Sequence, residues 1–454
     1  MRRAAALVRS VCAATGMSKQ SCDAGQRAGV SGFVRDSTAT LDDILPAGPP
    51  KHQSRQVSAS PRDDKLADVE VEVTPRAPGR LGSYTPATMM MWQERIAREA
   101  PGSHADQPAS ADGEPVLEPR APRKVVVRYP VSTVHDLHEL YQNPWGYVRI
   151  GRLLEDFDSV AGTVAFLHSH ENAHHRPVLV TASVDRITAH GELCLEKDFR
   201  LEGRTIWTGR SSMDILIQCI ADGQAQPVLE AVFTFVGRDP ATGKAAPLPA
   251  VKPESALDAE WFEKRQKVND HQKALRKARQ QAGTASTNEP LDPRAAALLA
   301  EGAALQDLPA LGADDAVVAS GTELTSVLLM QPQERNMAGK VFGGHLMGRA
   351  YELGFAAALV FSGSKPSLVE VGAVTFDRPV EVGDLIKFTA TVLHTRRVGD
   401  ASRVFVEVEA HRMNPREVVS EVTNRFRFEY EVEGGVKRVL PATEEQARKL
   451  MRYL

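Results

Sequence analysis

The 454-residue sequence has few cysteines and aromatic residues, no long apolar run and no marked excess of charge of either sign. Its four cysteines, of which Cys12 and Cys22 lie near the N-terminus, do not make a disulfide framework and are compatible with a reducing compartment. No apolar run approaches the roughly 18 residues of a membrane helix, so we expect a soluble protein. A formal net charge of −3 gives no whole-chain attraction to nucleic acid or membrane.

The first quarter of the chain differs in composition from the rest. Residues 1–22 carry basic residues and no acid amid Ala, Val and Ser, which predicts an organelle transit peptide, mitochondrial with plastid as the alternative. A merely disordered basic terminus is the other interpretation. Residues 23–121 are rich in Pro, Ala, Ser and Arg and predict a low-order region, apart from an extended Val69–Thr74 and a helical Thr88–Arg95.

One sequence frame occurs twice, 193 positions apart. Asn-x-x-Gly-x-Val-x-x-Gly-x-Leu starts at Asn143 and again at Asn336, and in each case precedes an apolar helical pattern. Fifteen residues after the first Asn stands Asp158, whereas fifteen after the second stands Tyr351. A duplicated unit has thus kept its amide twice and its carboxylate once, which predicts one working site built from two halves.

Each half has the same order of expected elements: a strand, the Asn-x-x-Gly turn, a helix and four strands. This order predicts an α+β tandem in which a curved antiparallel sheet grips a long helix in each half, and the two sheets join by their edges. The expected strands after the helices are Val178–Ile187, Phe199–Trp207, Met213–Ile220, Val228–Val236, Leu368–Phe376, Leu385–Leu393, Val404–Ala410 and Val418–Tyr430. The predicted domains are 122–240 and 316–431, with a linker at 241–315 and a tail at 432–454.

The linker contains a charged helical segment, Ser255–Gln281, with Trp261 and Phe262 on its apolar side. Its basic residues are Lys264, Arg265, Lys267, Lys273, Arg276, Lys277 and Arg279. We expect a solvated connecting helix, and a contact for a phosphate-bearing ligand is the alternative.

These motifs resemble the mitochondrial two-domain acyl-CoA thioesterases of the hotdog fold, over residues 122–431. The resemblance rests on Asn336-Met-Ala-Gly-Lys-Val-Phe-Gly-Gly-His-Leu-Met and on Arg149-Ile-Gly-Arg-Leu-Leu-Glu-Asp-Phe-Asp. Supporting segments are Thr208–Ile215, Gln333–Asn336 and Phe376–Asp384. The resemblance implies a tandem hotdog fold and hydrolysis of a fatty acyl-CoA to free acid and CoA.

By the same resemblance, an amide before the helix, a backbone N–H at its start and a carboxylate two turns into it form a site drawn from two hotdog units. The catalytic positions implied are Asp158, Asn336, Gly343 and Gly344, with Asn143 and Gly151 as their counterparts on the substrate-binding side. The second half departs from this pattern at Tyr351. Glu352 is adjacent but lies about 100° around the helix.

The residues themselves fit the chemistry of thioester hydrolysis, which needs an activated water and a stabilised oxyanion. Asp158 shares a helix flank with Leu154, Ala161 and Ala165, and partial desolvation there would raise its basicity; a solvated acidic helix entry is the alternative. Gly343 and Gly344 would let a ligand oxygen approach the helix-start amides, or would simply allow a tight turn. Water activation and an acyl anhydride on Asp158 both remain open.

For Asn336 the two interpretations are polarisation of the thioester carbonyl and capping of a turn. Candidate contacts for the CoA phosphates lie at strand ends, where exposed basic residues are also common for other reasons. These candidates are Arg210, Ser211, Ser212, Arg396 and Arg397.

One motif points elsewhere: His170-Glu-Asn-Ala-His174 matches the zinc-protease pattern, close to His168 and His175. Pro177 follows so closely that we expect no helix to present both histidines, and we expect no metal or other cofactor.

The same fold also accommodates two different functions. A hotdog hydratase or dehydratase would need a histidine base, which His345 is placed too early to supply. A non-catalytic acyl-CoA-binding or assembly protein would need no base at all. By analogy we expect a homo-oligomer, a trimer of tandem chains, with no nucleic-acid partner.

Overall fold

The computed structural model describes residues 68–72, 117–169, 177–281, 290–308, 314–336, 339–376 and 378–453. These residues belong to one compact unit, residues 65–454. The predicted transit segment and the predicted helix Thr88–Arg95 lie outside the described residues. Within the predicted low-order region, the extended segment forms strand β1 (Asp68–Glu72), which pairs in parallel with β2 (Lys124–Tyr129).

The N-terminal half contains the predicted helix and four-strand series. After β2, a short helix α4 (His135–Tyr141) precedes the long helix α5 (Ile150–Ser169). The strands that follow are β3 (Val178–Val184), β4 (Ile187–Ala189), β5 (Phe199–Thr208), β6 (Ser212–Ala221) and β7 (Leu229–Arg238). The predicted strand Val178–Ile187 therefore consists of two strands, β3 and β4, because Asp185 and Arg186 between them are not in strand conformation.

The C-terminal half repeats the series with longer strands. It opens with β9 (Leu324–Leu329), and after the turn helix η4 (Pro332–Glu334) comes the long helix α8 (Gly343–Ser362). The strands that follow are β10 (Ser367–Val371), β11 (Val374–Thr375), β12 (Leu385–Val398), β13 (Ala401–Asn414) and β14 (Val419–Glu433). The matching order in both halves confirms the tandem hotdog fold.

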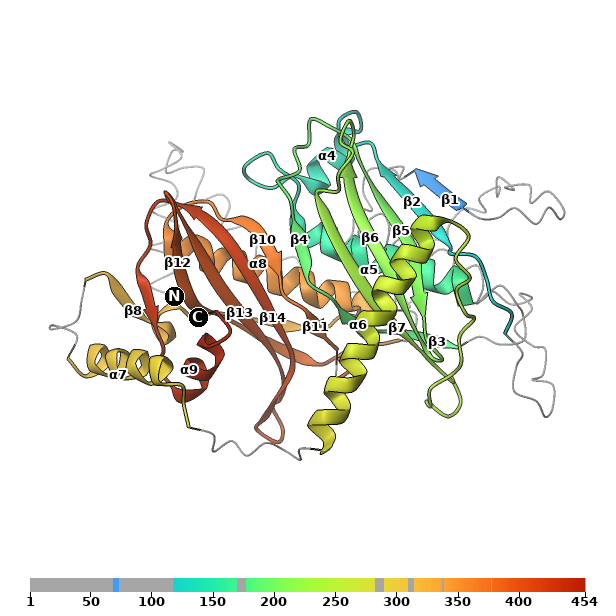
Figure 1. The fold of residues 1–454 in the computed structure, drawn as a ribbon. Helices are drawn as coiled ribbons and strands as arrows, with labels where there is room; N and C mark the ends of the chain where they lie inside the picture. The colour runs from blue at the N-terminus through green and yellow to red at the C-terminus, as the bar shows by residue number, and fades with distance from the viewer. Residues whose placement is uncertain are drawn as a thin grey trace, which may run out of the picture. The chain divides into compact units, whose positions relative to one another are not determined.

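The two sheets join into one continuous sheet, as the sequence predicted (Figure 1). The strand order is β1-β2-β5-β6-β7-β4-β10-β14-β13-β12-β9, and β3 and β11 also pair with each other at the junction. Across the junction Thr188 pairs with Glu370 and Ser183 with Thr375, both antiparallel. The junction strands of the two halves therefore run past each other around a pseudo-two-fold axis.

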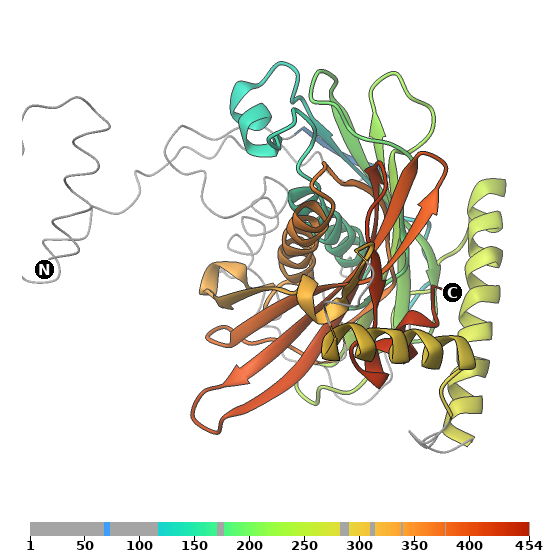
Figure 2. The ribbon, with the colours of Figure 1, turned by 90° about the vertical axis from the view of Figure 1, so that its left-hand side faces the viewer.

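Helices α5 and α8 lie on one face of this sheet and contact each other (Figure 2). Their helical spacing places apolar side chains against the strands, and on α5 Phe157, Val160 and Val164 are all at most 2% exposed. Small residues on α8, such as Ala350 and Gly354, bring it close to the sheet; a Cβ at Gly354 would lie 2.9 Å from the Phe428 ring. This close packing fixes the start of each helix against the other half.

Helix α6 (Ala256–Gln281) contacts β5, on the other side of the sheet from α5 and α8 in Figure 2. Arg265 is only 7% exposed and donates to Asp214 at 3.0 Å and to Asp185 at 2.6 Å. Trp207 also donates to Gln266 at 2.8 Å. The expectation of a solvated connecting helix is therefore wrong at Arg265, which docks the helix through a buried ion pair.

The segments around the C-terminal half carry short elements that the sequence did not predict. Helix α7 (Pro293–Asp307) follows α6. Strand β8 (Ala316–Val318) is followed by the turn helix η3 (Ala319–Thr322) and pairs in parallel with β15 (Arg438–Leu440). Helix α9 (Glu444–Leu450) closes the described chain. Among the described helices, none is long and apolar enough to cross a bilayer.

Candidate active site

The repeated Asn-x-x-Gly frame forms the same turn in both halves. The Asn143 Oδ1 accepts hydrogen bonds from the Tyr147 N–H at 3.0 Å and from a second amide of the turn. The Asn336 Oδ1 accepts from the Lys340 N–H at 3.1 Å, four residues on, as in the first half. The glycine of each frame has φ +79°, a conformation that residues with a Cβ rarely adopt. The side-chain oxygen of each Asn thus has a structural role in its turn.

In the second half this turn precedes α8, and the two glycines at the start of α8 allow it to approach α5 closely. A Cβ at Gly344 would lie 2.9 Å from the Asp158 Cβ and 3.0 Å from the Glu155 Cα. A Cβ at Gly343 would lie 3.1 Å from both the Asp158 Oδ2 and the Phe376 ring. Any larger residue at either position would push α5 away from the start of α8.

Asp158 receives hydrogen bonds from both halves. The Gly344 N–H, from α8, donates to its Oδ2 at 2.6 Å, and the Thr181 hydroxyl, from β3, donates to its Oδ1 at 3.0 Å. Asp158 is 1% exposed, and burial raises the pKa of its carboxyl from 3.8 to about 6, against the opposing effect of these two hydrogen bonds. The carboxylate is thus held in place and is more basic than an exposed aspartate.

The structure corrects the alternative of a solvated acidic helix entry, because the neighbouring acids are buried too. Asp156 is fully buried and accepts from the Tyr141 hydroxyl of α4. Burial raises the pKa of Glu155 to about 7, against the nearby Arg152 and Arg349. Of these three acids, Asp158 is the one whose carboxylate accepts from the start of α8.

His345 follows Gly344 and lies between two glutamates, with its ring nitrogens 3.8 Å from Glu155 Oε1 and 3.4 Å from Glu334 Oε1. It is 6% exposed, and burial together with nearby arginines lowers its pKa to about 3. We therefore regard His345 as a neutral residue that packs between Glu155 of α5 and Glu334 of η4.

The second half replaces both Asp158 and its hydroxyl partner with apolar or aromatic groups. Tyr351, in register with Asp158, is 6% exposed and packs against Phe428 and Tyr430. Leu368 is the counterpart of Thr181, since each precedes a register shift and pairs with an equivalent residue of β14 or β7. The residues in register therefore supply no second carboxylate with a hydroxyl partner.

Glu352 nevertheless reaches the counterpart of the Gly344 helix start. Its Oε1 accepts from the Arg149 Nε at 2.7 Å and would lie 2.6 Å from a Cβ at Gly151. Tyr351 and Glu352 point in different directions from α8, as predicted from their separation of about 100°. The Glu352 side chain is nevertheless long enough to reach the start of α5, because Gly151 has no Cβ there. Glu352 is thus an ion-paired carboxylate, with a side chain 38% exposed, whereas Asp158 is buried.

Comparisons with known proteins show the family of the chain. No protein-family model matches the chain. The chain is 37% identical over 391 residues to the mitochondrial acyl-coenzyme A thioesterase 4 of Humulus lupulus, covering 82% of this chain and 73% of that protein. It is 31% identical over 357 residues to the mitochondrial acyl-coenzyme A thioesterase 9 of Homo sapiens, covering 75% and 78%. The chain belongs to the acyl-coenzyme A thioesterases.

A partial likeness also extends to a solved structure, the acyl-CoA hydrolase of Bacillus cereus, at TM-score 0.29 and 24% identity over 34% of this chain and 88% of that one. Membership of the thioesterase family makes this protein a hydrolase of acyl-CoA thioesters. The resemblance inferred from the two motifs is therefore confirmed.

The predicted phosphate contacts of this thioesterase lie at two separate places. Arg210 and Ser211 form the turn between β5 and β6, where their carbonyls accept from Leu248 and Gly237, and Ser212 pairs with Val236 on β7. This turn lies at the Thr181 end of the N-terminal sheet, because Met213, Phe235 and Thr181 form one row across β6, β7 and β3.

Arg396 and Arg397 lie at the β12–β13 hairpin instead. Arg396 pairs with Arg403, and its guanidinium lies over the Phe405 ring, whereas the Arg397 Nε donates to the Gly399 carbonyl. Arg403 pairs with Glu431 on β14, and Glu431 pairs with Ser367 on β10. This end of the C-terminal sheet therefore lies beside Leu368, the counterpart of Thr181, and not beside Thr181 itself. The structure therefore does not bring these two arginines to Asp158.

The His-Glu-x-x-His motif lies outside the described residues, but its neighbour His168 is described. His168 is buried at the end of α5, with its Nε2 3.1 Å from the Pro249 carbonyl, and burial lowers its pKa to about 4. No group of three potential metal-ligating side chains occurs among the described residues. His168 is accounted for as a buried packing residue.

Proposed function

We propose that this thioesterase works through one composite site in which Asp158 is the general base. The observation that carries the proposal is the hydrogen bond of 2.6 Å from the Gly344 amide to the buried Asp158 carboxylate, which couples the two halves at one point. A base with a pKa near 6 is ionised at neutral pH and yet more basic than an ordinary aspartate. The Thr181 hydroxyl holds its other oxygen.

In the proposed reaction, Asp158 takes a proton from a water molecule as the water oxygen attacks the thioester carbon. The carbonyl electrons move onto the oxygen, and they return as the carbon–sulfur bond breaks. The CoA thiolate leaves and receives the proton from Asp158, so the carboxylate is regenerated. The net products are a free acid and CoA.

The oxyanion needs donors other than the Gly344 amide, because that amide already donates to Asp158. The Gly343 N–H lies one residue earlier at the positive end of α8, and a Cβ there would lie 3.1 Å from the Asp158 Oδ2. We assign the oxyanion to the Gly343 amide, assisted by the Asn336 side-chain NH₂, whose companion oxygen serves the turn. Gly344 then has the role of orienting the base.

Direct attack of Asp158 on the thioester, giving an acyl anhydride, is the covalent alternative. A single turnover in ¹⁸O-labelled water distinguishes the two reactions. Direct water attack puts the label only in the fatty acid, whereas hydrolysis of an anhydride at its aspartyl carbon leaves the label in the Asp158 carboxylate.

We propose that the protein acts in the mitochondrion, with the plastid as alternative, because both of those compartments appear in the names of its relatives. We also propose association of tandem chains, with a trimer as the arrangement expected by analogy. Strand β9 ends the described sheet, and its outward Val327 and Leu329 are 48% and 53% exposed. The mass in solution of Leu329→Lys, compared with the parent, tests this: an unchanged mass would exclude β9 as the contact.

The test of the catalytic proposal is thiol release from a panel of short- to long-chain acyl-CoAs. The parent is expected to hydrolyse at least one chain length, and Asp158→Asn is expected to lose about two or more orders of magnitude in kcat/KM while staying folded. Full activity of Asp158→Asn would exclude the proposed site.

A further inference from the structure

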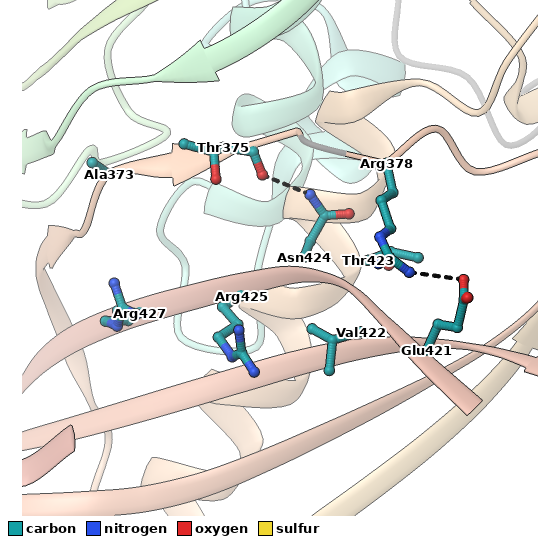
Figure 3. A pocket seen from close by; sticks show the side chains of 9 residues that line it. All are labelled: Ala373, Thr375, Arg378, Glu421, Val422, Thr423, Asn424, Arg425 and Arg427. Carbon is teal, nitrogen blue, oxygen red and sulfur yellow. Dashed lines mark hydrogen bonds and ion pairs between the residues drawn. The ribbon is translucent and has the colours of Figure 1, made fainter. Parts of the chain in front are cut away.

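A pocket of about 590 Å³ lies in the C-terminal half, where β11 leaves the edge of β14 to pair with β3 (Figure 3). Strand β10 pairs with β14 as far as Val371 and Phe428, and beyond Gly372 the chain diverges. The opening lies between β11 and residues 421–427 of β14. The pocket forms because β11 pairs with β3 of the N-terminal half, which leaves this part of β14 without a paired neighbour on that side among the described strands.

The pocket and the Asp158 site lie on opposite sides of the same short strand. Thr375 lines the pocket, and the next residue, Phe376, has its ring 3.1 Å from the Cβ position of Gly343. Successive side chains of a strand point to opposite faces. The Phe376 N–H also donates to the Ala182 carbonyl at 2.9 Å, next to Thr181. A ligand that passes around β11 would therefore reach from the pocket to Asp158.

The lining is positively charged: it contains three arginines and one glutamate. Arg425 and Arg427 each use their Nε on a β13 carboxylate, Glu409 at 2.8 Å and Glu407 at 3.0 Å. Arg378 pairs with the lining glutamate, Glu421, at 2.9 Å. A guanidinium has five N–H donors in a planar fork, so one such contact holds the group in position and still allows it to bind a phosphate.

The pocket also contains a buried acceptor without a donor. Asn424 is 3% exposed, and its Nδ2 donates to the Thr375 carbonyl at 2.9 Å. Its Oδ1 has no hydrogen-bond partner among the described residues, and Figure 3 shows this oxygen directed toward the side of the pocket that bears Arg378. A buried unpaired acceptor is unfavourable, so a ligand N–H that reached it would remove that cost.

We propose that this pocket binds the adenosine-phosphate end of acyl-CoA. The phosphates would contact Arg378, Arg425 and Arg427, and an N–H of the ligand would donate to Asn424. This inference rests on the proposed function, because it assigns the distal part of the same substrate. Under this proposal Arg396 and Arg397 of the hairpin are not the C-terminal phosphate contacts. Arg396 pairs with Arg403, which lies four residues, or about 13 Å, along β13 from Glu407, the partner of the pocket residue Arg427.

The experiment compares Arg378→Ala with Arg412→Ala. Both arginines bind Glu421 at 2.9 Å, but of the two only Arg378 lines the pocket. We expect Arg378→Ala to raise KM for acyl-CoA by about tenfold, and to leave kcat/KM for the matching acyl-pantetheine, which lacks the nucleotide, unchanged. Arg412→Ala is expected to change neither value.

Calorimetric binding of CoA, adenosine 3′,5′-bisphosphate and ATP separates this inference from the catalytic proposal. We expect Arg378→Ala, and more strongly Arg378→Ala with Arg425→Ala, to weaken CoA and the bisphosphate alike, whether or not Asp158 proves to be the base. An equal loss on acyl-CoA and acyl-pantetheine, or unaltered CoA binding by the double variant, would overturn it. ATP binding that does not compete with CoA would also overturn it, since the pocket would then hold a free nucleotide.

Discussion

Replacement of Asp158 by Asn tests the role of the carboxylate with little change in shape. The amide keeps an oxygen for the Gly344 N–H, and its NH₂ can donate to the Thr181 oxygen, whose hydroxyl hydrogen can rotate. The variant therefore keeps both contacts but cannot accept a proton from water. Loss of activity would then reflect chemistry, and the fold should be retained.

The structure sets the expected size of both effects. Loss of a general base lowers kcat/KM by about 10²- to 10⁴-fold. The folded-state pKa of about 6 lies above the ordinary 3.8, so the folded protein binds the proton more tightly and stability falls as pH rises through this window. Above about pH 6 the ionised carboxylate costs about 3 kcal/mol, a cost that the neutral amide avoids. Asp158→Asn should thus be inactive at pH 8 and at least as heat-stable as the parent.

The assay is thiol release from acyl-CoA between pH 5 and 9, beside thermal unfolding at pH 5 and 8. For the parent, kcat/KM should rise with pH through about 6 and then level. Glu155→Gln is the matched control, because Glu155 is a second buried acid on α5, and it should keep activity within about tenfold. The reasoning would be refuted if Asp158→Asn kept the parent's rate, or if the acid limb survived unchanged in that variant.

Three further predictions concern the neighbours of the base. Thr181→Ala removes a hydrogen bond that lowers the pKa of Asp158, so the acid limb of the pH–rate profile should move upward and kcat/KM should fall about tenfold, with recovery in Thr181→Ser. Gly344→Ala places a Cβ within 3.0 Å of the α5 backbone, and calorimetry should find it about 1–3 kcal/mol less stable, whereas Gly191→Ala, in open space, should not differ from the parent. Glu352→Gln should keep kcat within about twofold, because its carboxylate is ion-paired; a large loss would show that the second half is active.

Much of the fold could be predicted because the information is local and repeated. The frame from Asn143 and Asn336 marked both helix starts, and alternating patterns marked the strands to within a few residues. Helices α4 and α9 have only seven residues each, too short to be stable without tertiary contacts, so their sequences carry little signal. The burial of Asp156 depends on Tyr141 of α4 and was missed for the same reason.

The part of the candidate site that lies in or near the duplicated sequence frame could be predicted. Asp158 was identified because an internal copy shows which residues differ, whereas the Gly343–Gly344 helix start was implied by the family resemblance. Thr181 lies 23 residues after Asp158 on another element, and only the fold brings them together. The hydrogen bond from the Gly344 amide to Asp158 likewise joins residues 186 positions apart, so the sequence did not show that this amide is already occupied.

The pocket arginines had no distinctive sequence signal. Arg425 and Arg427 alternate with Phe426 and Phe428, which in a sequence reads simply as the polar face of a strand. They become a candidate site because β11 leaves β14 beside them. Sequence periodicity cannot reveal where a sheet divides.

The most direct test of the composite site is a crystal structure of Asp158→Asn with an unhydrolysed acyl-CoA. The account predicts that the thioester carbonyl lies between the side chain at position 158 and the Gly343 amide at the start of α8. A thioester found instead beside Glu352 and Gly151 would contradict it, because the reaction would then belong to the other helix start.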